Sequence, residues 1–527
     1  RYTVQMAEKI DAALFEACHL IDRPPAQWLA ETLEGGEVIG YDPWLVTADQ
    51  AQRFESACGK AGAVLKALDE NPIDAVWDDR PGPPMAPVEI YPDALAGRSA
   101  NEKQQEVCDA LTKAGADAAL LTLSDSIAWL FNIRGRDVPH TPVVQAYAIL
   151  HRDDVPDLYI HPGKLGEAAA AHLSAVAKIH PPEDFATALA GLGATGAAVL
   201  VDPASAPEQV RVAVADSGGR IVTGADPCVL PKARKTAAEL DGTRAAHRRD
   251  AVAMARFLCW LDGEAPEGRL DEVAVVRRLE ELRAETNELR DISFDTIAGA
   301  GPHAAIPHYR VTSASNRPVE RDAILLVDSG GQYLDGTTDI TRTIIVGDPT
   351  AEMRQRFTLV LKGMIAISRL RFPKGTSGAQ VDGFARHALW QAGLDFDHGT
   401  GHGVGIYLSV HEGPQRLSKA GRTELDAGMI LSNEPGYYRE GHYGIRIENL
   451  VVVTEPADIP GGERPMHGFE TLTLAPIDRR LIDPALLSPD EIDWLDAYHA
   501  RVLAEVGPLV EPPVRRWLEE ATGPLAR

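Results

Sequence analysis

Two apolar runs, each joined to an aspartate, constrain the fold of this chain more than any other stretch. The first run extends from Ala323 to Val327 and ends in Asp328, a polar Asp335-Gly336 pair follows, and the second run starts at Asp339 and reaches Val346. Apolar runs separated by turn residues predict a β-hairpin or a bulged β-ribbon. The two aspartates then lie on neighbouring strands near the turn. Two buried anions that close together repel each other, so the pattern indicates either a bound cation or a shared proton.

Composition excludes several kinds of partner. The 527 residues are enough for roughly three domains. Acidic side chains outnumber basic ones by 77 to 52, and the net charge of −25 argues against nucleic acid and anionic membrane surfaces. The five cysteines contain no CxxC pair, which suits reduced, buried thiols in the cytoplasm better than disulfides or a zinc finger. No apolar run approaches the length of about 18 residues that a membrane helix needs. We therefore expect a cytoplasmic protein.

Alternating helical and strand-like segments predict a chain of α/β and α+β units, over residues 1–91, 92–230 and 231–527. The stretch Pro81–Pro87, rich in proline and glycine, is the expected linker between the first two units. Helices are expected near Val4–Ala17, Asp49–Ala61, Asn101–Lys113, Gly166–Lys178, Ala237–Leu261, Ala351–Arg369 and Ala379–Ala392. Further strands are expected at Val38–Tyr41, Ala118–Leu123, Ala146–Leu150, Asp157–His161 and Ala197–Val201. In the tail, Ser488-Pro489-Asp490-Glu491 is a capping box that predicts one more helix.

Side chains suited to metal binding and catalysis gather in four further segments of the third unit. They are Ile306–Tyr309, His398–Gly405 with Val410–Pro414, Ser432–Tyr438 and Gly444–Leu450. Each contributes glutamate or histidine from a glycine-rich or strand-end context. Carboxylates with one imidazole are the donors that a pair of divalent ions such as Mn²⁺, Co²⁺ or Zn²⁺ accepts.

Each feature has an ordinary structural explanation when it stands alone. Two aspartates ten residues apart are most often solvated turn residues, and a single His308 or His411 is more often a hydrogen-bonded structural imidazole. Glu434 before a proline can fix a turn, and Glu448 can pair with Arg446. The glycine-rich segment 399–405 lacks the GxGxxG and GKS/GKT spacings and the βαβ context of a phosphate loop. The coincidence of all these segments in one chain favours the metal site.

Together these motifs resemble a known family. The segments 328–343, 398–405, 410–414, 433–438 and 445–449 resemble the long, three-domain form of Xaa-Pro aminopeptidase (aminopeptidase P), of the creatinase/methionine aminopeptidase superfamily. The likeness extends to Ser126–Gly135 and to Glu491–Leu495, so it covers nearly the whole chain. By the same comparison Arg1 falls inside the family's first domain, whose start we expect to be missing here.

The resemblance implies a fold and a set of site residues. It implies two creatinase-like α/β domains followed by a pita-bread catalytic domain with a helical tail. Two divalent ions, usually Mn²⁺ with Zn²⁺ or Co²⁺ as alternatives, are expected on Asp328, Asp339, His402, Glu434 and Glu448. Glu434 also serves as the proton acceptor, His308, His398 and His411 line the substrate site, and Arg446 lies behind the metals. Because all five ligand positions are filled, a metal-free relative such as creatinase is a poorer match.

The expected function is removal of the N-terminal residue from peptides with proline at the second position, by an enzyme that in this family is usually a homodimer. Two alternatives stay open. One is a prolidase that cleaves only Xaa-Pro dipeptides, which the long double front domain makes the weaker choice. The other is a non-catalytic peptide-binding module, in which lost metal ligands would be expected.

Overall fold

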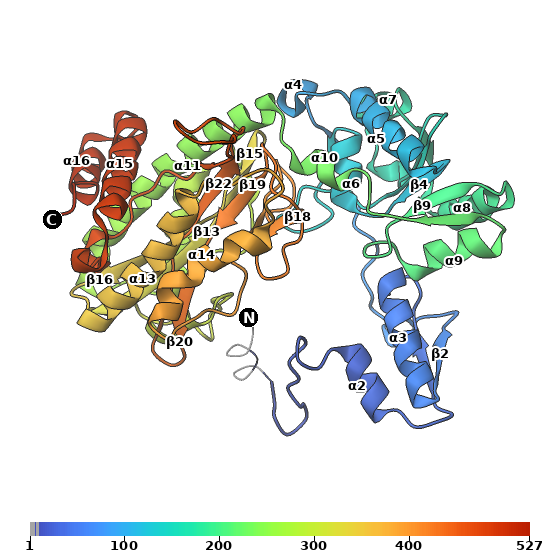
Figure 1. Ribbon diagram of the computed structural model, residues 1–527, viewed down its shortest axis with the longest axis horizontal. Coiled ribbons are helices and arrows are strands. Elements are labelled where there is room, and N and C mark those ends of the chain that lie inside the picture. The colour runs from blue at the N-terminus through green and yellow to red at the C-terminus, as the bar shows by residue number, and fades with distance from the viewer. Residues whose placement is uncertain (1–5, 7–9, 527) are drawn as a thin grey trace. The chain divides into compact units, whose positions relative to one another are not determined.

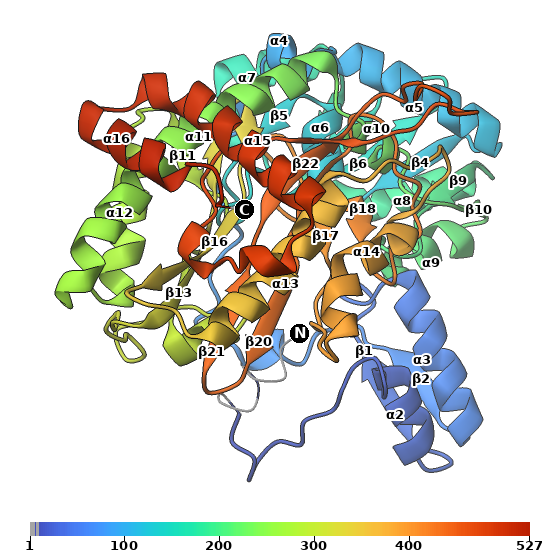
Figure 2. The ribbon, with the colours of Figure 1, turned by 60° about the vertical axis from the view of Figure 1, so that its left-hand side comes forward.

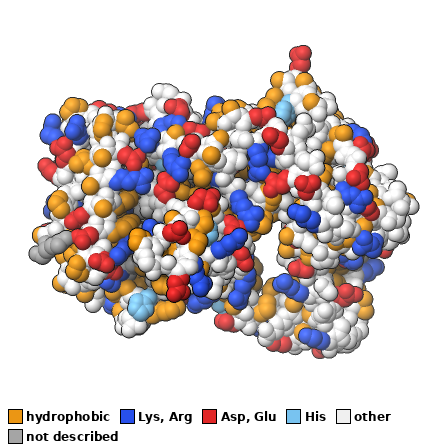
Figure 3. Space-filling view, turned by 45° about the horizontal axis from the view of Figure 1, so that its top comes forward, with side chains coloured by type: hydrophobic (Ala, Val, Ile, Leu, Met, Phe, Trp, Pro, Cys, Tyr) orange, Lys and Arg blue, Asp and Glu red, His pale blue; other side chains and the backbone are white. Residues whose placement is uncertain are grey.

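The computed structural model describes Met6 and residues 10–526, and it divides into two compact units (Figure 1). One unit comprises Asp11–Val138 with Pro142–Lys232, and the other is formed mainly by Ala233–Arg527. Among the described helices, none combines the length and the apolar character that crossing a bilayer requires. All five cysteines are free; Cys58 and Cys228 are buried as expected, whereas Cys18 is exposed. Acidic and basic side chains are interspersed on the face drawn in Figure 3.

The first unit is built from α/β elements. Its small sheet pairs β1 (Val38–Tyr41) in parallel with β2 (Val64–Ala67), beside α2 (Pro25–Thr32) and α3 (Ala48–Ala61). Its largest sheet has the order β10-β9-β4-β6-β7-β8, with bounds Arg220–Thr223, Ala198–Val201, Ala118–Leu121, Tyr147–His151, Asp157–Tyr159 and Lys178–His180. A separate pair joins β3 (Glu89–Ile90) to β5 (Ile133–Arg134). The remaining α-helices are α4 (Asp93–Ala96), α5 (Ala100–Ala114), α6 (Ser124–Leu130), α7 (Glu167–Ser174), α8 (Phe185–Ala194), α9 (Glu208–Asp216) and α10 (Val229–Ala233).

One predicted helix of this unit is wrong where it can be judged. Residues 4, 5 and 7–9 of the expected helix Val4–Ala17 lie outside the described residues, and residues 11–17 form a turn followed by irregular chain. The carboxylate of Asp11 accepts a hydrogen bond from the N–H of Ala13 at 2.9 Å, a local turn that competes with helix formation. Leu14 and Phe15 are exposed, so no packed core stabilises a helix there.

The predicted ribbon is confirmed in the second unit. β13 (Ala323–Ser329) pairs antiparallel with β16 (Ile340–Val346), from Ala323 opposite Val346 to Ser329 opposite Ile340. Between them, β14 (Gly331–Tyr333) and β15 (Gly336–Thr337) form a small hairpin with Asp335 in its turn. Asp339 directly precedes β16. The ribbon therefore brings Asp328 and Asp339 to the same end of the β13–β16 pair.

Three further groups of strands complete this unit. β12 (Ile297–Ala300) flanks β13, and β11 (Leu289–Ile292) pairs with β14. A five-stranded sheet has the order β18-β17-β19-β22-β23, with bounds Glu412–Leu417, Gly401–Gly403, Ile430–Asn433, Asn449–Val453 and Phe469–Thr471. β20 (Gly436–Arg439) and β21 (Tyr443–Arg446) form a hairpin.

Six of the described helices belong to this unit. They are α11 (Ala237–Glu264), α12 (Glu272–Ala284), α13 (Ala351–Ser368), α14 (Gly378–Gln391), α15 (Pro489–Val506) and α16 (Pro512–Ala521). α13 and α14 pack side by side (Figures 1 and 2). The predicted capping box at the start of α15 is present. The Ser488 hydroxyl accepts from the backbone N–H of Glu491, and the Glu491 carboxylate accepts from the backbone N–H of Ser488.

The ribbon strands are buried on both faces. On one face, Ile324 and Leu326 of β13 join a core shared with α13 and α15. On the other, Leu325 and Val327 join a core shared with α11 and α12. Because side chains alternate along a strand, Asp328 belongs to the face of Leu326.

Arg342 is the polar anchor on the other face of β16. Its guanidinium is buried and donates to six acceptors. Nε donates to Pro476 O, Nη1 donates to the carbonyls of Thr341 and Glu448, and Nη2 donates to Asn449 Oδ1, Ala475 O and the Tyr498 hydroxyl. One side chain thereby joins β16 to the segment before the C-terminal helices.

His499 of α15 makes the stability of this unit depend on pH. It is buried and accepts a hydrogen bond from the N–H of Ile477 at 3.1 Å. Burial, with the nearby charges of Arg342 and Arg479, lowers the pKa of His499 to about 3. The unfolded chain takes up this proton at about pH 6.5, so stability falls as pH drops from there toward 3, by up to about 1.4 kcal/mol per pH unit.

We expect His499→Gln to flatten this dependence. Glutamine can still accept from Ile477 but does not titrate. The slope of the free energy of unfolding against pH should therefore fall by up to about 1.4 kcal/mol per pH unit between pH 6 and pH 4. Denaturant unfolding at several pH values measures the slope, and His442→Gln at an exposed position is the control. Equal slopes for the wild type and His499→Gln would show that His499 does not set the acid sensitivity.

Candidate metal centre and active site

One cavity in the second unit is lined by all nine sequence-predicted site residues. β13 supplies Asp328, β17 supplies His402, and Glu434 directly follows β19. Glu448 lies between β21 and β22, and Asp339 precedes β16. The other four predicted site residues in the lining are His308, His398, His411 and Arg446, and Phe294, Ile297 and Pro307 also line the cavity.

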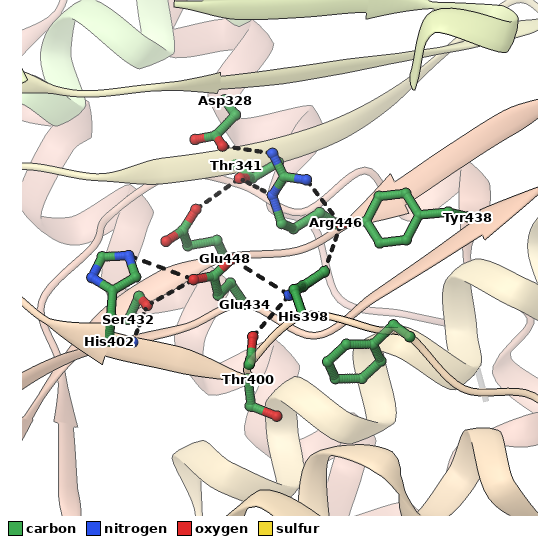
Figure 4. Close-up of polar contacts among 12 residues, drawn as sticks. Asp328, Thr341, His398, Thr400, His402, Ser432, Glu434, Tyr438, Arg446 and Glu448 are labelled. Carbon is green, nitrogen blue, oxygen red and sulfur yellow. Dashed lines mark hydrogen bonds and ion pairs between the residues drawn. The ribbon is translucent and has the colours of Figure 1, made fainter. Parts of the chain in front are cut away.

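The potential metal donors approach one another closely (Figure 4). His402 Nε2 lies 3.6 Å from Asp339 Oδ2 and 3.5 Å from Glu434 Oε1. Donor atoms of Asp339, His402 and Glu448 all lie within 4.8 Å of one another. Close backbone packing makes this possible, because a Cβ on Gly401 would overlap the carbonyl oxygen of Ser432 on the adjacent strand.

Two carboxylates each keep one oxygen available for a cation. Asp328 Oδ2 accepts from Arg446 Nη2, and Glu448 Oε2 accepts from the Thr341 hydroxyl at 2.7 Å. Among the described residues, Asp328 Oδ1 and Glu448 Oε1 are buried without a hydrogen-bond partner. A buried carboxylate oxygen without a partner is strongly unfavourable, and a metal ion would satisfy it.

The electrostatics of the cluster also fit a cation. Burial and the neighbouring carboxylates of Glu448, Asp328 and Glu434 raise the pKa of Asp339 well above its usual value. Burial, with Asp328 and Glu434, likewise raises the pKa of Glu448. Ionised carboxylates at this density need positive charge beyond the single guanidinium of Arg446, and divalent ions would supply it.

Hydrogen bonds set the protonated nitrogen of His402. Its Nδ1 lies 2.9 Å from the carbonyl oxygen of Gly403, which can only accept, so Nδ1 carries the proton. The lone pair of Nε2 then faces the carboxylates, as a metal ligand requires. The Ser432 hydroxyl accepts from the backbone N–H of His402 at 3.0 Å and donates to Glu434 Oε1 at 3.1 Å, so it positions both residues.

A second network fixes His398. Arg446 donates through Nη1 to the Tyr438 hydroxyl at 2.8 Å and through Nε to the Thr341 hydroxyl at 3.0 Å. Burial raises the pKa of Tyr438 to about 12, so its hydroxyl keeps its proton and can donate it to His398 Nε2 at 2.8 Å. His398 Nδ1 lies 2.8 Å from the Gly399 carbonyl, which completes a neutral, oriented imidazole.

Some site residues were not predicted from the sequence. Thr341 lies in the motif 328–343 and Tyr438 in the motif 433–438. The spacing of two residues from Asp339 to Thr341 could have indicated that Thr341 faces the site, because residues two apart on a strand share a face. The cavity walls Phe294, Ile297 and Pro307 carried no comparable signal, since apolar residues in strands and loops are common.

Family models cover most of the chain. Residues 241–455 match metallopeptidase family M24, residues 79–239 match the creatinase/prolidase N-terminal domain, and residues 465–525 match the C-terminal region of peptidase M24. The probable Xaa-Pro aminopeptidase P of Paracoccidioides lutzii is 39% identical over 100% of this chain and 88% of its own length. That of Coccidioides posadasii is 38% identical over 100% of this chain.

Solved structures confirm the predicted fold class. X-prolyl aminopeptidase from Caenorhabditis elegans, described as a cytosolic enzyme with a di-nuclear active site, superposes with a TM-score of 0.94 at 35% identity, over 99% of this chain and 87% of its own. Xaa-Pro dipeptidase from Bacillus anthracis shares the fold over 72% of this chain, with a TM-score of 0.58 at 22% identity. The chain combines a creatinase-type N-terminal region with a pita-bread catalytic domain. It belongs to the Xaa-Pro aminopeptidase P family, within metallopeptidase family M24.

Proposed function

We propose that this chain is a two-metal aminopeptidase that releases the N-terminal residue from peptides with proline at the second position. The observation that carries the proposal is the convergence of five donor side chains on one cavity, with an available oxygen on Asp328 and on Glu448. The similarity to aminopeptidase P over the full chain favours this activity over that of a prolidase.

The five side chains that would hold the two ions are Asp328, Asp339, His402, Glu434 and Glu448. Oxygen donors with a single imidazole favour Mn²⁺, with Zn²⁺ or Co²⁺ as alternatives. When bound, such ions supply Lewis-acid polarisation of the peptide carbonyl and make water acidic enough to attack near neutral pH.

Glu434 is placed to move the proton. It lines the cavity, and the Ser432 hydroxyl holds its Oε1 in position. A glutamate here can take the proton from the attacking water and return it to the leaving group. That return is needed because the proline nitrogen of an Xaa-Pro bond carries no hydrogen and cannot leave unprotonated.

Three histidines form the substrate side of the cavity. His411 lies beside His402, with ring centroids 4.3 Å apart, and its position suits a donor to the developing oxyanion. His308 and His398 would border the pocket for the proline ring. Arg446 would act behind the metals, by holding Asp328 and the Tyr438–His398 network.

We expect His411→Ala to lower kcat for an Xaa-Pro peptide by about 10- to 100-fold or more, with both metals still bound. The reason is that His411 is not among the five metal donors. Steady-state kinetics with metal analysis of the same sample measures both quantities, and His442→Ala at an exposed turn is the matched control. Full activity of His411→Ala would remove this residue from the mechanism.

The direct test uses the purified chain loaded with Mn²⁺ and two substrates. Release of arginine from Arg-Pro-Pro supports the aminopeptidase, whereas cleavage of Ala-Pro alone would support a prolidase. Peptide binding without cleavage, at full metal loading, would support a non-catalytic module.

We extend the proposal to assembly and location. A homodimer follows from the family resemblance and is testable by light scattering. A cytoplasmic location is supported by the five free cysteines and by the cytosolic relative from Caenorhabditis elegans. We also propose the division into domains at 1–91, 92–230 and 231–527, which the separate β1–β2 and six-stranded sheets support.

A further inference from the structure

The loop that carries His308 is organised around one buried carboxylate, Glu272, at the start of α12. The Glu272 side chain has no exposed surface. Its Oε1 accepts from the N–H of Ala300 and from His303 Nδ1, each at 2.8 Å. Its Oε2 accepts from the Tyr309 hydroxyl at 2.9 Å and from the N–H of Arg317 at 3.1 Å. This loop is the connection between β12 and β13, residues 301–322. The four donors extend from Ala300, the last residue of β12, to Arg317 within the loop.

Other contacts tighten the same loop. The N–H of Glu272 donates to the carbonyl of Arg317 at 3.0 Å, so the residue holds the loop by its backbone as well. The His303 ring stacks on Tyr309 with centroids 4.4 Å apart. From the opposite side, β21 approaches so closely that a Cβ on Gly444 would overlap the carbonyl oxygen of Ala304.

A carboxylate matches this position best. Four donors converge on it, and two carboxylate oxygens provide about four lone pairs. A glutamine offers one acceptor oxygen, and its NH₂ group faces one of the two backbone N–H groups, of Ala300 or of Arg317, which then loses its acceptor. The Tyr309 hydroxyl keeps an acceptor, because it also lies 3.0 Å from the Ser315 carbonyl oxygen. The geometry therefore makes the loop conformation depend on the charge and shape of a single side chain.

We propose that Glu272 is a positioning residue for substrate recognition, which sets where His308 and Pro307 lie at the cavity wall. Glu272 does not line that cavity and acts through Tyr309, the residue after His308. This inference rests on the aminopeptidase activity proposed above. The metal donors come from other segments, so disturbing this brace changes substrate binding more than metal loading.

The test compares three variants of the full chain loaded with Mn²⁺. Glu272→Gln is expected to raise KM for Arg-Pro-Pro about 10-fold or more, and to lower kcat/KM by up to about 100-fold through misplacement of His308. Backbone amides of residues 300–317 should exchange hydrogen for deuterium faster, while metal content stays at the wild-type level. Tyr309→Phe removes one of the four contacts of Glu272, together with the hydroxyl's contacts to Ser315, and should change KM and exchange in the same direction by less. Glu280→Gln is the matched control, since Glu280 lies on α12 but accepts from Thr296 outside the loop.

Each outcome decides the proposal. Unchanged KM in Glu272→Gln, or faster exchange without a kinetic effect, would overturn the positioning role. Loss of bound metal in step with activity would assign Glu272 to general folding instead. If Glu272→Gln does not fold, Tyr309→Phe decides by the same two readouts. A wild-type protein that cleaves no peptide would refute the proposed function, while deuterium exchange would still show whether Glu272 holds the loop.

Discussion

Asp339→Asn is expected to abolish both metal loading and peptide cleavage. Asp339 is buried among carboxylates, and its oxygen lies 3.6 Å from His402 Nε2 at the centre of the donor cluster. The amide is a neutral, weaker ligand, so we expect turnover to fall by more than about 1,000-fold. Metal analysis and cleavage of Arg-Pro-Pro at saturating Mn²⁺ measure the two effects.

The same variant should leave the metal-free protein folded. Burial and three neighbouring carboxylates raise the pKa of Asp339, which shows that its charge is unfavourable when no cation is present. Removing that charge should therefore leave the Tm of the metal-free protein unchanged or higher, while the rise in Tm on adding Mn²⁺ disappears. Asp348→Asn, at an exposed position beyond β16, is the control. Xaa-Pro cleavage by metal-replete Asp339→Asn would refute the assignment.

Arg342→Met is expected to cause the largest loss of stability. The substitution keeps much of the buried apolar stem but removes the guanidinium from its acceptors, among them the carbonyls of Glu448 and Pro476. Two other carbonyls keep a donor, because the Tyr498 hydroxyl also donates to Ala475 O and the N–H of Glu448 also donates to Thr341 O. Unpaired buried acceptors each lower stability by about 1–3 kcal/mol, so the two carbonyls of Glu448 and Pro476 give an expected loss of about 2–6 kcal/mol. That is a large share of a typical total of about 5–15 kcal/mol.

Denaturant unfolding followed by tryptophan fluorescence measures this loss. Arg416→Met on β18 is the matched control, because Arg416 is exposed and its removal strands no buried acceptor cluster. If Arg342→Met and Arg416→Met were equally stable, the six contacts of Arg342 would contribute nothing net to folding.

Local sequence signals predicted most elements because local and tertiary preferences agree in them. The capping box of α15 and the apolar spacing of α11 are satisfied within a few residues of chain. The helix expected at Val4–Ala17 failed because its apolar side chains find no core, which a short window of sequence does not reveal.

The donor cluster was predictable for a different reason. Its residues are chemically unusual and come from motifs that recur together, so resemblance located them even though they are up to 120 residues apart along the chain. Glu272 and Tyr438 show the limit of this approach. Both residues act through tertiary contacts. Glu272 of α12 contacts Tyr309 in the loop after β12, and Tyr438 of β20 contacts His398. No local sequence pattern predicts contacts between segments so far apart in the chain.

Strand β16 has two structural roles in the catalytic unit. Two successive side chains of this strand point to opposite faces and hold different parts of the unit. Thr341 donates to the carboxylate of Glu448, whereas Arg342 donates to the carbonyls of Ala475 and Pro476, in the segment that leads to the terminal helices. A shift of this strand by one residue would turn each side chain to the opposite face, and both sets of hydrogen bonds would be lost. The register of this one strand therefore fixes both the Glu448 carboxylate and the chain that leads to the carboxy-terminal helices.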